Sequence, residues 1–210
     1  MSDPSPPPSR HFSMIRGFHL ADFLTLGNAA CGVGAVFLAM LYTATLEEAH
    51  FYVAAALAPA ALAFDILDGR VARWRQQHSA LGRELDSLAD VISFGVAPAA
   101  MGFAAGMQGG WDAVILVYFV CCGVSRLARY NVTAEALSEG GEKVKYFEGT
   151  PIPTSVLLTG LLAIVAWKGR IGDDLWGGAW SLGWTLHPLA LLFALSGTLM
   201  ISKTLRIPKV

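Results

Sequence analysis

Six long apolar runs, separated by short polar connectors, constrain the fold of this chain more than any other feature of its sequence. A helix needs about 20 apolar residues to cross a bilayer, and each run has about that length. We therefore expect an all-α, polytopic membrane protein with six transmembrane helices. The runs cover roughly residues 20–42, 50–69, 85–106, 111–130, 150–168 and 184–202.

The composition supports a membrane protein and argues against a soluble domain. Of the 210 residues only 15% are charged and 54% are hydrophobic, whereas soluble domains carry about a quarter charged residues. Residues 1–10 are rich in proline and serine, which predicts a disordered cytosolic tail. We expect residues 11–210 to form one transmembrane domain. The three cysteines lie inside apolar runs, which favours packing roles over a disulfide or a zinc site.

The distribution of basic residues predicts the orientation in the membrane. If the amino terminus is cytosolic, 13 of the 15 Lys and Arg residues fall on the cytosolic side of the six spans. Only Lys168 and Arg170 fall outside, and this asymmetry is the one that the positive-inside rule describes. We expect both termini in the cytosol, and the bacterial inner membrane is the expected location.

Four aspartates lie where apolar runs meet polar connectors. Asp65 and Asp68 end the second run, and Asp86 and Asp90 begin the third. Spacings of three and four residues place each pair on one face of its helix. Because consecutive spans joined by a short connector are antiparallel neighbours, all four carboxylates are expected to meet at the cytosolic end. The alternative is a set of helix-end aspartates that are merely solvated.

Such a cluster of carboxylates predicts bound cations. Unneutralised carboxylates in one place repel each other, and oxygen ligands suit Mg²⁺, Mn²⁺ or Ca²⁺ better than zinc. Two divalent ions bridged by carboxylates form a clamp for displacement at phosphorus. Gly69 and Ala72 keep the adjacent helix face narrow, Gly82 leaves an open face one turn before Asp86, and Arg73 can reach phosphate oxygens.

The stretch from Asp65 to Arg73, followed by eight residues and then Gly82 to Asp90, resembles the signature of the CDP-alcohol phosphotransferase family at every fixed position. The resemblance implies a membrane enzyme that transfers a phosphatidyl group from CDP-diacylglycerol to an alcohol and releases CMP. It also implies two divalent cations, Mg²⁺ or Mn²⁺, as cofactors.

The resemblance implies roles for individual residues. Asp65, Asp68 and Asp86 would hold the metal pair, and Asp90 would be both a further ligand and the general base. The CDP pocket would be lined by Gly69, Ala72, Arg73 and Gly82. Two polar residues of the first run, Thr25 and Asn28, either face the nucleotide or form hydrogen bonds within the helix bundle.

Three looser stretches resemble the phosphatidylserine synthases of this family, which makes L-serine the expected acceptor. They are residues 93–98, 122–131 and 146–154. Serine is a zwitterion, so Arg126 and Arg129 can bind its carboxylate, and Glu148 can bind its ammonium. The alternative for both arginines is a helix-end anchor or a contact with anionic lipids. Lys143 and Lys145 keep glycerol phosphate open as an acceptor, and inositol phosphate is another.

The sequence also bears on the oligomeric state, on binding partners and on an alternative class of membrane protein. Small residues at helix-packing spacing, such as Gly27, Cys31 and Gly34, serve either internal packing or a homodimer interface. Membrane lipids are expected partners, nucleic acids are not, and an ether-lipid donor stays open. A transporter with acidic intramembrane residues is a different reading, but transport sites typically lie near the bilayer midplane.

Overall fold

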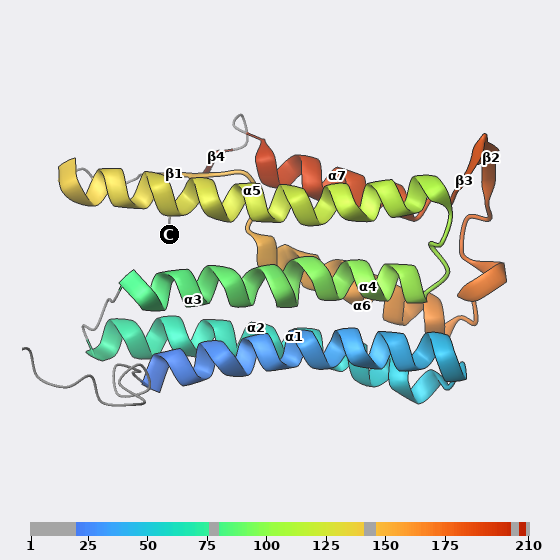
Figure 1. Ribbon diagram of the computed structural model, residues 1–210, viewed down its shortest axis with the longest axis horizontal. Helices are drawn as coiled ribbons and strands as arrows, with labels where there is room; N and C mark the ends of the chain where they lie inside the picture. The colour runs from blue at the N-terminus through green and yellow to red at the C-terminus, as the bar shows by residue number, and fades with distance from the viewer. Residues whose placement is uncertain (1–19, 76–79, 141–145, 203–205, 209–210) are drawn as a thin grey trace, which may run out of the picture.

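The computed structural model describes residues 20–75, 80–140, 146–202 and 206–208. The expected tail, residues 1–10, lies outside the described residues. Helices dominate the described chain, as the apolar runs predict (Figure 1). The helices are α1 (Leu20–Thr45), α2 (Glu48–Arg75), α3 (Ala80–Asp90), the π-helical turn η2 (Val91–Val96), α4 (Ala97–Ala104), α5 (Gly110–Gly140), α6 (Val156–Trp167) and α7 (Ala190–Ile201).

Within the described residues, four helices are long and apolar enough to cross a membrane. They are α1, α2, α5 and the continuous stretch of α3, η2 and α4. The helices α6 and α7 have 12 residues each, which corresponds to about 18 Å of helix. The hydrocarbon core is about 30 Å thick, so these two helices by themselves are too short to cross it. The short turn η3 (Ile152–Ser155) lengthens α6 at its start.

The structure corrects the expected bounds of several segments. The expected sixth run begins at residue 184, but residues 184–186 are the second strand of a β-hairpin, in which β2 (Trp180–Leu182) pairs with β3 (Trp184–Leu186). The helix α7 begins only at Ala190. Gly183, at φ +79°, supplies the tight turn between the two strands.

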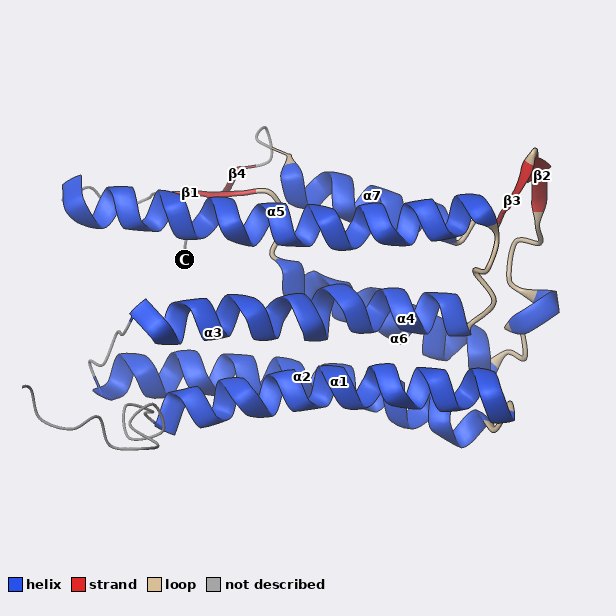
Figure 2. Cartoon of the chain, in the orientation of Figure 1, coloured by secondary structure: helices blue, strands red, loops and turns tan. Residues whose placement is uncertain are grey.

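Two further differences concern the polar connectors. Most of the expected connector between the second and third runs is helical, because α2 continues to Arg75 and α3 begins at Ala80. A second strand pair, β1 (Tyr146–Glu148) with β4 (Arg206–Pro208), adds to the helical fold. The two strand pairs lie toward opposite ends of the helices (Figure 2).

The helices run roughly parallel or antiparallel to one another in a bundle. α1 and α2 lie side by side, the α3–α4 stretch packs against α1, and α5 packs against α7 (Figure 1). The end of the bundle where α1 begins, α2 ends and α3 begins is called the site end below. The β2–β3 hairpin marks the opposite end, called the hairpin end.

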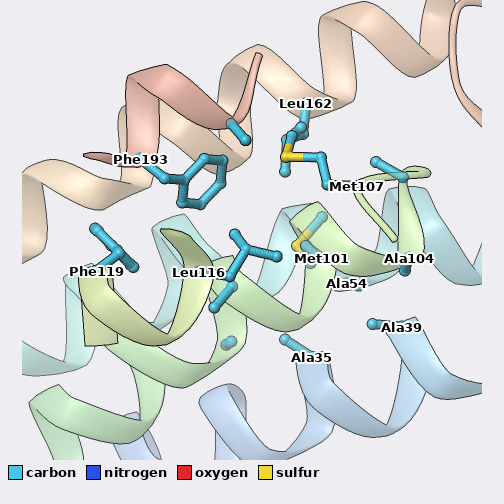
Figure 3. Close-up of a cluster of buried hydrophobic side chains, with 14 of the residues drawn as sticks. Ala35, Ala39, Ala54, Met101, Ala104, Met107, Leu116, Phe119, Leu162 and Phe193 are labelled. Carbon is cyan, nitrogen blue, oxygen red and sulfur yellow. The ribbon is translucent and has the colours of Figure 1, made fainter. Parts of the chain in front are cut away.

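The buried core lies in the middle of the bundle, where small and large side chains alternate (Figure 3). Ala35, Ala39 and Ala54 let α1 and α2 approach closely. Farther from them, Phe119 of α5 and Phe193 of α7 meet edge to face with ring centroids 5.3 Å apart. The core therefore fixes α5 against α7, and α1 against α2, before any polar contact is considered.

Three glycines show how the helices pack. A Cβ atom at Gly27 would lie 3.2 Å from the ring of Phe64, and one at Gly34 would lie 3.2 Å from Leu57, both on α2. A Cβ atom at Gly102 would meet Phe193 at the same distance. These positions therefore pack closely against neighbouring helices of the same chain, and whether the chain forms a dimer stays a prediction.

Candidate functional site

Three carboxylates converge at the site end of the bundle. Asp65 and Asp68 lie on one face of α2, and Asp86 lies on α3, which runs antiparallel to α2 (Figure 1). One oxygen from each of the three carboxylates lies within 4.8 Å of the others. The spacing of three residues on α2 and the short connection to α3 bring these groups together, as the sequence predicts.

The surroundings of this trio suit a divalent cation. Asp68 is buried, and the hydroxyl of Thr25 donates a hydrogen bond of 2.7 Å to its Oδ2 atom. The Oδ1 atom of Asp86 is buried and has no hydrogen-bond donor among the described residues. A buried anionic oxygen without a donor is costly, and a hard cation coordinated by it and its neighbours would remove that cost.

Asp90 lies one turn beyond Asp86 on α3 and is buried. It does not belong to the trio with mutual oxygen distances within 4.8 Å, although it interacts electrostatically with Asp65 and Asp86. Its Oδ1 atom accepts a hydrogen bond of 3.2 Å from the amide Nδ2 of Asn28. Asp90 is thus next to the expected metal ligands and, like Asp68, accepts a hydrogen bond from a side chain of α1.

Thr25 and Asn28 both point from α1 toward the acidic residues. Each donates a hydrogen bond to a carboxylate across the helix interface, Thr25 to Asp68 and Asn28 to Asp90. The sequence left open whether these residues face the nucleotide or form hydrogen bonds within the helix bundle, and both form hydrogen bonds within the bundle. The Oδ1 atom of Asn28 is buried with no partner among the described residues, so one acceptor remains for a ligand.

The expected nucleotide residues surround the same end of α2 and α3. Arg73 is exposed, and its guanidinium lies over Gly69, where a Cβ atom would be 3.5 Å from Nη1. Ala72 and Gly82 are half-buried. A long, exposed guanidinium on a helix face without side chains can meet a phosphate group that approaches along that face.

Of the expected acceptor residues, the structure brings Arg126 to the site. This side chain is half-buried on α5, its Nε atom has no partner among the described residues, and its charge interacts with that of Asp90. Arg129 is half-buried one turn further on. Glu148 belongs to β1, but its side chain lies outside what the structure describes, as do Lys143 and Lys145.

One contact at the site end does not follow from sequence reasoning. Ser87 of α3 and Asn131 of α5 form reciprocal hydrogen bonds: Nδ2 of Asn131 donates to Oγ of Ser87 at 3.0 Å, and that hydroxyl to Oδ1 of Asn131 at 3.3 Å. The pair joins the helix of Asp86 to the helix of Arg126. Both residues lie within the motifs named above, which was the available signal, but their separation of 44 residues hides the fact that they are partners.

Comparisons with known proteins agree with this geometry. The sequence profile described as CDP-alcohol phosphatidyltransferase matches residues 18–196. The chain is 44% identical over 208 residues to the CDP-diacylglycerol–serine O-phosphatidyltransferase of Saccharomyces cerevisiae, covering 95% of this chain and 74% of the relative.

Two other relatives are shorter matches. The Mycobacterium tuberculosis protein of the same name is 38% identical over 143 residues, which is 66% of this chain and 48% of that relative. The archaetidylserine synthase of Methanothermobacter thermautotrophicus is 36% identical over 141 residues, covering 66% of this chain and 54% of that protein. The match thus spans about half the length of these two relatives.

The profile match covers most of the chain, including all four aspartates of the signature and the helices that carry them. The long match to the yeast enzyme includes the same region. On these grounds, together with the converging carboxylates, the chain belongs to the CDP-alcohol phosphatidyltransferase family.

Proposed function

We propose that this chain transfers the phosphatidyl group of CDP-diacylglycerol to the hydroxyl group of L-serine and releases CMP. The observation that carries the proposal is the convergence of three carboxylates from two antiparallel helices, with oxygens within 4.8 Å of one another. The names of the relatives support serine as the acceptor.

The proposed roles of the residues follow from their positions. Asp65, Asp68 and Asp86 would hold two divalent cations, Mg²⁺ or Mn²⁺, with Asp90 as a further ligand; Ca²⁺ is another cation that such a site can bind. When bound, the cations would neutralise the pyrophosphate of the CDP-lipid. Arg73 would bind phosphate oxygens, and the narrow helix face would admit the nucleotide.

In the proposed reaction Asp90 accepts the proton of the serine hydroxyl. The freed oxygen forms a bond to the phosphorus that bears the lipid, and the bond from that phosphorus to the bridging oxygen breaks. CMP leaves with the electron pair of that bond. Arg126 is near Asp90, and its Nε atom has no partner among the described residues. It would bind the serine carboxylate, with Arg129 and Glu148 as further acceptor contacts.

We also propose a six-span topology with the site facing the cytosol. The described chain begins and ends at the site end of the bundle (Figure 1). If that end faces the cytosol, the expected topology assigns 13 of the 15 Lys and Arg residues to the cytosolic side. With flanking residues, α6 and α7 would complete the fifth and sixth crossings. The same proposal includes one transmembrane domain from residue 11 onward, with a cytosolic tail before it. It also includes a homodimer and a location in a bacterial inner membrane.

The test is a parallel assay of acceptors with purified protein in detergent. CDP-diacylglycerol, Mn²⁺ or Mg²⁺, and radiolabelled serine, glycerol 3-phosphate, inositol or inositol phosphate are supplied separately, and the label in lipid is counted. Serine is expected to be incorporated at least tenfold faster than the others. If another acceptor is incorporated instead, the assignment of serine as acceptor is wrong. If CMP is not released, or is released without metal, the proposed metal-dependent activity is wrong.

The donor lipid can be tested in the same assay. The match to an archaetidylserine synthase makes a CDP-activated ether lipid a specific second donor. Comparing kcat/KM for the diacyl and diether forms with serine as acceptor decides which donor the chain prefers. We expect the diacyl form to be preferred, because the yeast relative, named for CDP-diacylglycerol, matches over a longer part of the chain.

A further inference from the structure

The segment that follows Asp90 is wound as a π-helix, and its contact with α1 is unusually close. In η2 the backbone N–H of Ala97 donates to the carbonyl of Ile92, five residues earlier. Single π-helical turns inside α-helices are rare and are frequent at functional sites. The segment also contains the start of the motif at residues 93–98, to which the proposed reaction assigns no role.

Gly32 permits the close contact between η2 and α1. A Cβ atom at this position would lie 2.5 Å from Oγ of Ser93 and 2.7 Å from its Cα atom. No side chain fits there without moving the backbone of η2. The contact therefore fixes the distance between the two helices one turn beyond Asp90.

The absence of a side chain at Gly32 also opens a polar contact. In an α-helix the carbonyl of residue 28 faces the amide of residue 32, so a glycine there exposes that carbonyl to a neighbouring helix. The hydroxyl of Ser93 uses this access and donates a hydrogen bond of 2.8 Å to the carbonyl oxygen of Asn28. Both residues are almost completely buried, at 2% and 0% exposure.

Asn28 connects this contact to the catalytic carboxylate. Its backbone accepts from Ser93, while its side-chain Nδ2 donates to Oδ1 of Asp90 at 3.2 Å. The two hydrogen bonds and the Gly32 contact thus join two residues of α1, Asn28 and Gly32, to Asp90 of α3 and Ser93 of η2. A donor fixed to one oxygen of Asp90 sets the orientation of the carboxylate and leaves the other oxygen for the acceptor.

We propose that Asn28, held in place by the contact of Gly32 with Ser93, is a positioning residue that orients Asp90 toward the acceptor hydroxyl. The proposal rests on the proposed function, in which Asp90 is the general base. Groups that orient a metal ligand or catalytic residue typically contribute about 10- to 100-fold to activity, because misplacement by about 1 Å can cost on the order of 100-fold.

The decisive variant is Ser93→Ala, which removes one hydroxyl and leaves the helix contact intact. The kcat with saturating substrates is expected to fall about 10- to 100-fold, while the KM for the CDP-lipid stays within about twofold. Asn28→Ala is expected to show the same pattern. Because Ser93 acts through Asn28, the double variant should lose no more activity than Asn28→Ala alone.

A pair of glycine variants on α1 provides the matched control. Gly32→Ala is expected to lower kcat at least as much as Ser93→Ala, since its Cβ atom displaces η2. Gly34→Ala, two residues along, meets only the flexible end of Leu57 and should keep wild-type kcat. If Gly32→Ala does not fold, Ser93→Ala decides the question, with the melting temperature confirming that it is folded.

Two outcomes would overturn the positioning role. One is a folded Ser93→Ala enzyme with wild-type kcat; the other is a loss confined to a higher KM for the CDP-lipid, which would make Asn28 a nucleotide contact. The comparison uses whichever alcohol the wild-type protein accepts. Failure with serine alone therefore refutes only the proposed acceptor, and the effect of Ser93→Ala is still measured.

Discussion

At the scale of single residues, the site combines groups that are buried, charged and incompletely paired. Asp86 has a buried oxygen without a donor, and Arg126 has a buried Nε atom without an acceptor among the described residues. Such atoms cost free energy in the unliganded fold. They indicate where a cation and an anionic group would bind, and three predictions follow from them and from Asp90.

The first prediction concerns the metal ligands. Asp86→Asn is expected to lower metal-dependent CMP release on the order of 1000-fold, because a lost cation removes several kcal/mol of charge stabilisation. Mn²⁺ binding, followed by electron paramagnetic resonance, should weaken in parallel. Glu84→Gln, an exposed neighbour on α3, is the control and should behave as wild type. Full activity of Asp86→Asn would contradict the metal assignment.

The second prediction separates base from ligand at Asp90. Asp90→Asn is expected to lower kcat by about 10²- to 10⁴-fold, the usual contribution of a general base. The dissociation constant for the CDP-lipid, measured by equilibrium binding with Mn²⁺ present, should change little. If binding is lost together with turnover, Asp90 is chiefly a metal ligand.

The third prediction concerns the acceptor. Arg126→Ala is expected to raise the KM for serine by roughly 10- to 100-fold, because a charge-assisted hydrogen bond contributes about 1.5–3 kcal/mol. The KM for the CDP-lipid should change much less. Arg83→Ala, an exposed arginine on α3, controls for the loss of positive charge at the site end. An unchanged KM for serine would leave Arg126 as a helix-end anchor.

At the scale of helices, the two ends of the bundle are held by different polar contacts. At the site end, the Ser87–Asn131 pair joins α3 to α5. At the hairpin end, the buried Asp112 of α5 accepts hydrogen bonds from the backbone N–H groups of Gly109 and His187 at 2.9 and 2.8 Å. The Nδ1 atom of His187 lies 2.6 Å from Oδ2 of Asp112. The contact of Asp112 with His187 attaches the segment just before α7 to α5, at the end of the bundle opposite the site.

This separation predicts that stability and catalysis can be changed independently. Asp112→Ala leaves buried donors unpaired and is expected to cost about 3 kcal/mol of unfolding free energy. Thermal unfolding in detergent should show a lower midpoint, while kcat at temperatures well below it stays near wild type. The exposed Asp174→Ala is the control. A large fall in kcat at low temperature would show that the hairpin end is coupled to the site.

At the scale of the whole molecule, the fold places the acidic cluster at one end and apolar surface along the sides. Large exposed side chains, among them Phe37, Met40, Val117 and Leu157, face outward along the helices, which suits contact with lipid tails. Trp176, Trp180 and Trp184 gather at the hairpin end, where indole rings favour a membrane interface. The lipid part of a substrate can therefore stay in the bilayer while its polar part enters at the site end.

The orientation in the membrane is testable by labelling. In a variant without Cys31, Cys121 and Cys122, a single cysteine is placed at Glu84 or at Arg170. A membrane-impermeant maleimide is added to cells whose outer membrane is permeabilised and whose inner membrane is intact. It is expected to label the cysteine at position 170. The cysteine at position 84 should be labelled only after the inner membrane is permeabilised as well. Labelling of both positions before permeabilisation would contradict the proposed topology.

Local patterns predict much of this protein. The apolar runs locate α1 and the starts of α2 and α5 within three residues, because a bilayer requires long apolar helices whatever surrounds them. They do not locate the ends of α2 and α5, which continue to Arg75 and Gly140, beyond the expected ends at residues 69 and 130. Helical periodicity likewise places Asp65 and Asp68 on one face, and the antiparallel connection brings Asp86 to them. The hairpin at residues 180–186 was not predicted, since strands of three residues are too short to show a clear alternation of polar and apolar side chains.

The sequence by itself determined the class of protein, the long helices and the identity of the acidic cluster, because these depend on hydropathy and on spacings of a few residues. Only the tertiary structure decided which residues hold the carboxylates. The contacts of Asn28 with Asp90, of Gly32 with Ser93 and of Ser87 with Asn131 join residues more than 40 positions apart. Such pairs depend on how helices are rotated and how closely they pack, and no local pattern encodes either quantity.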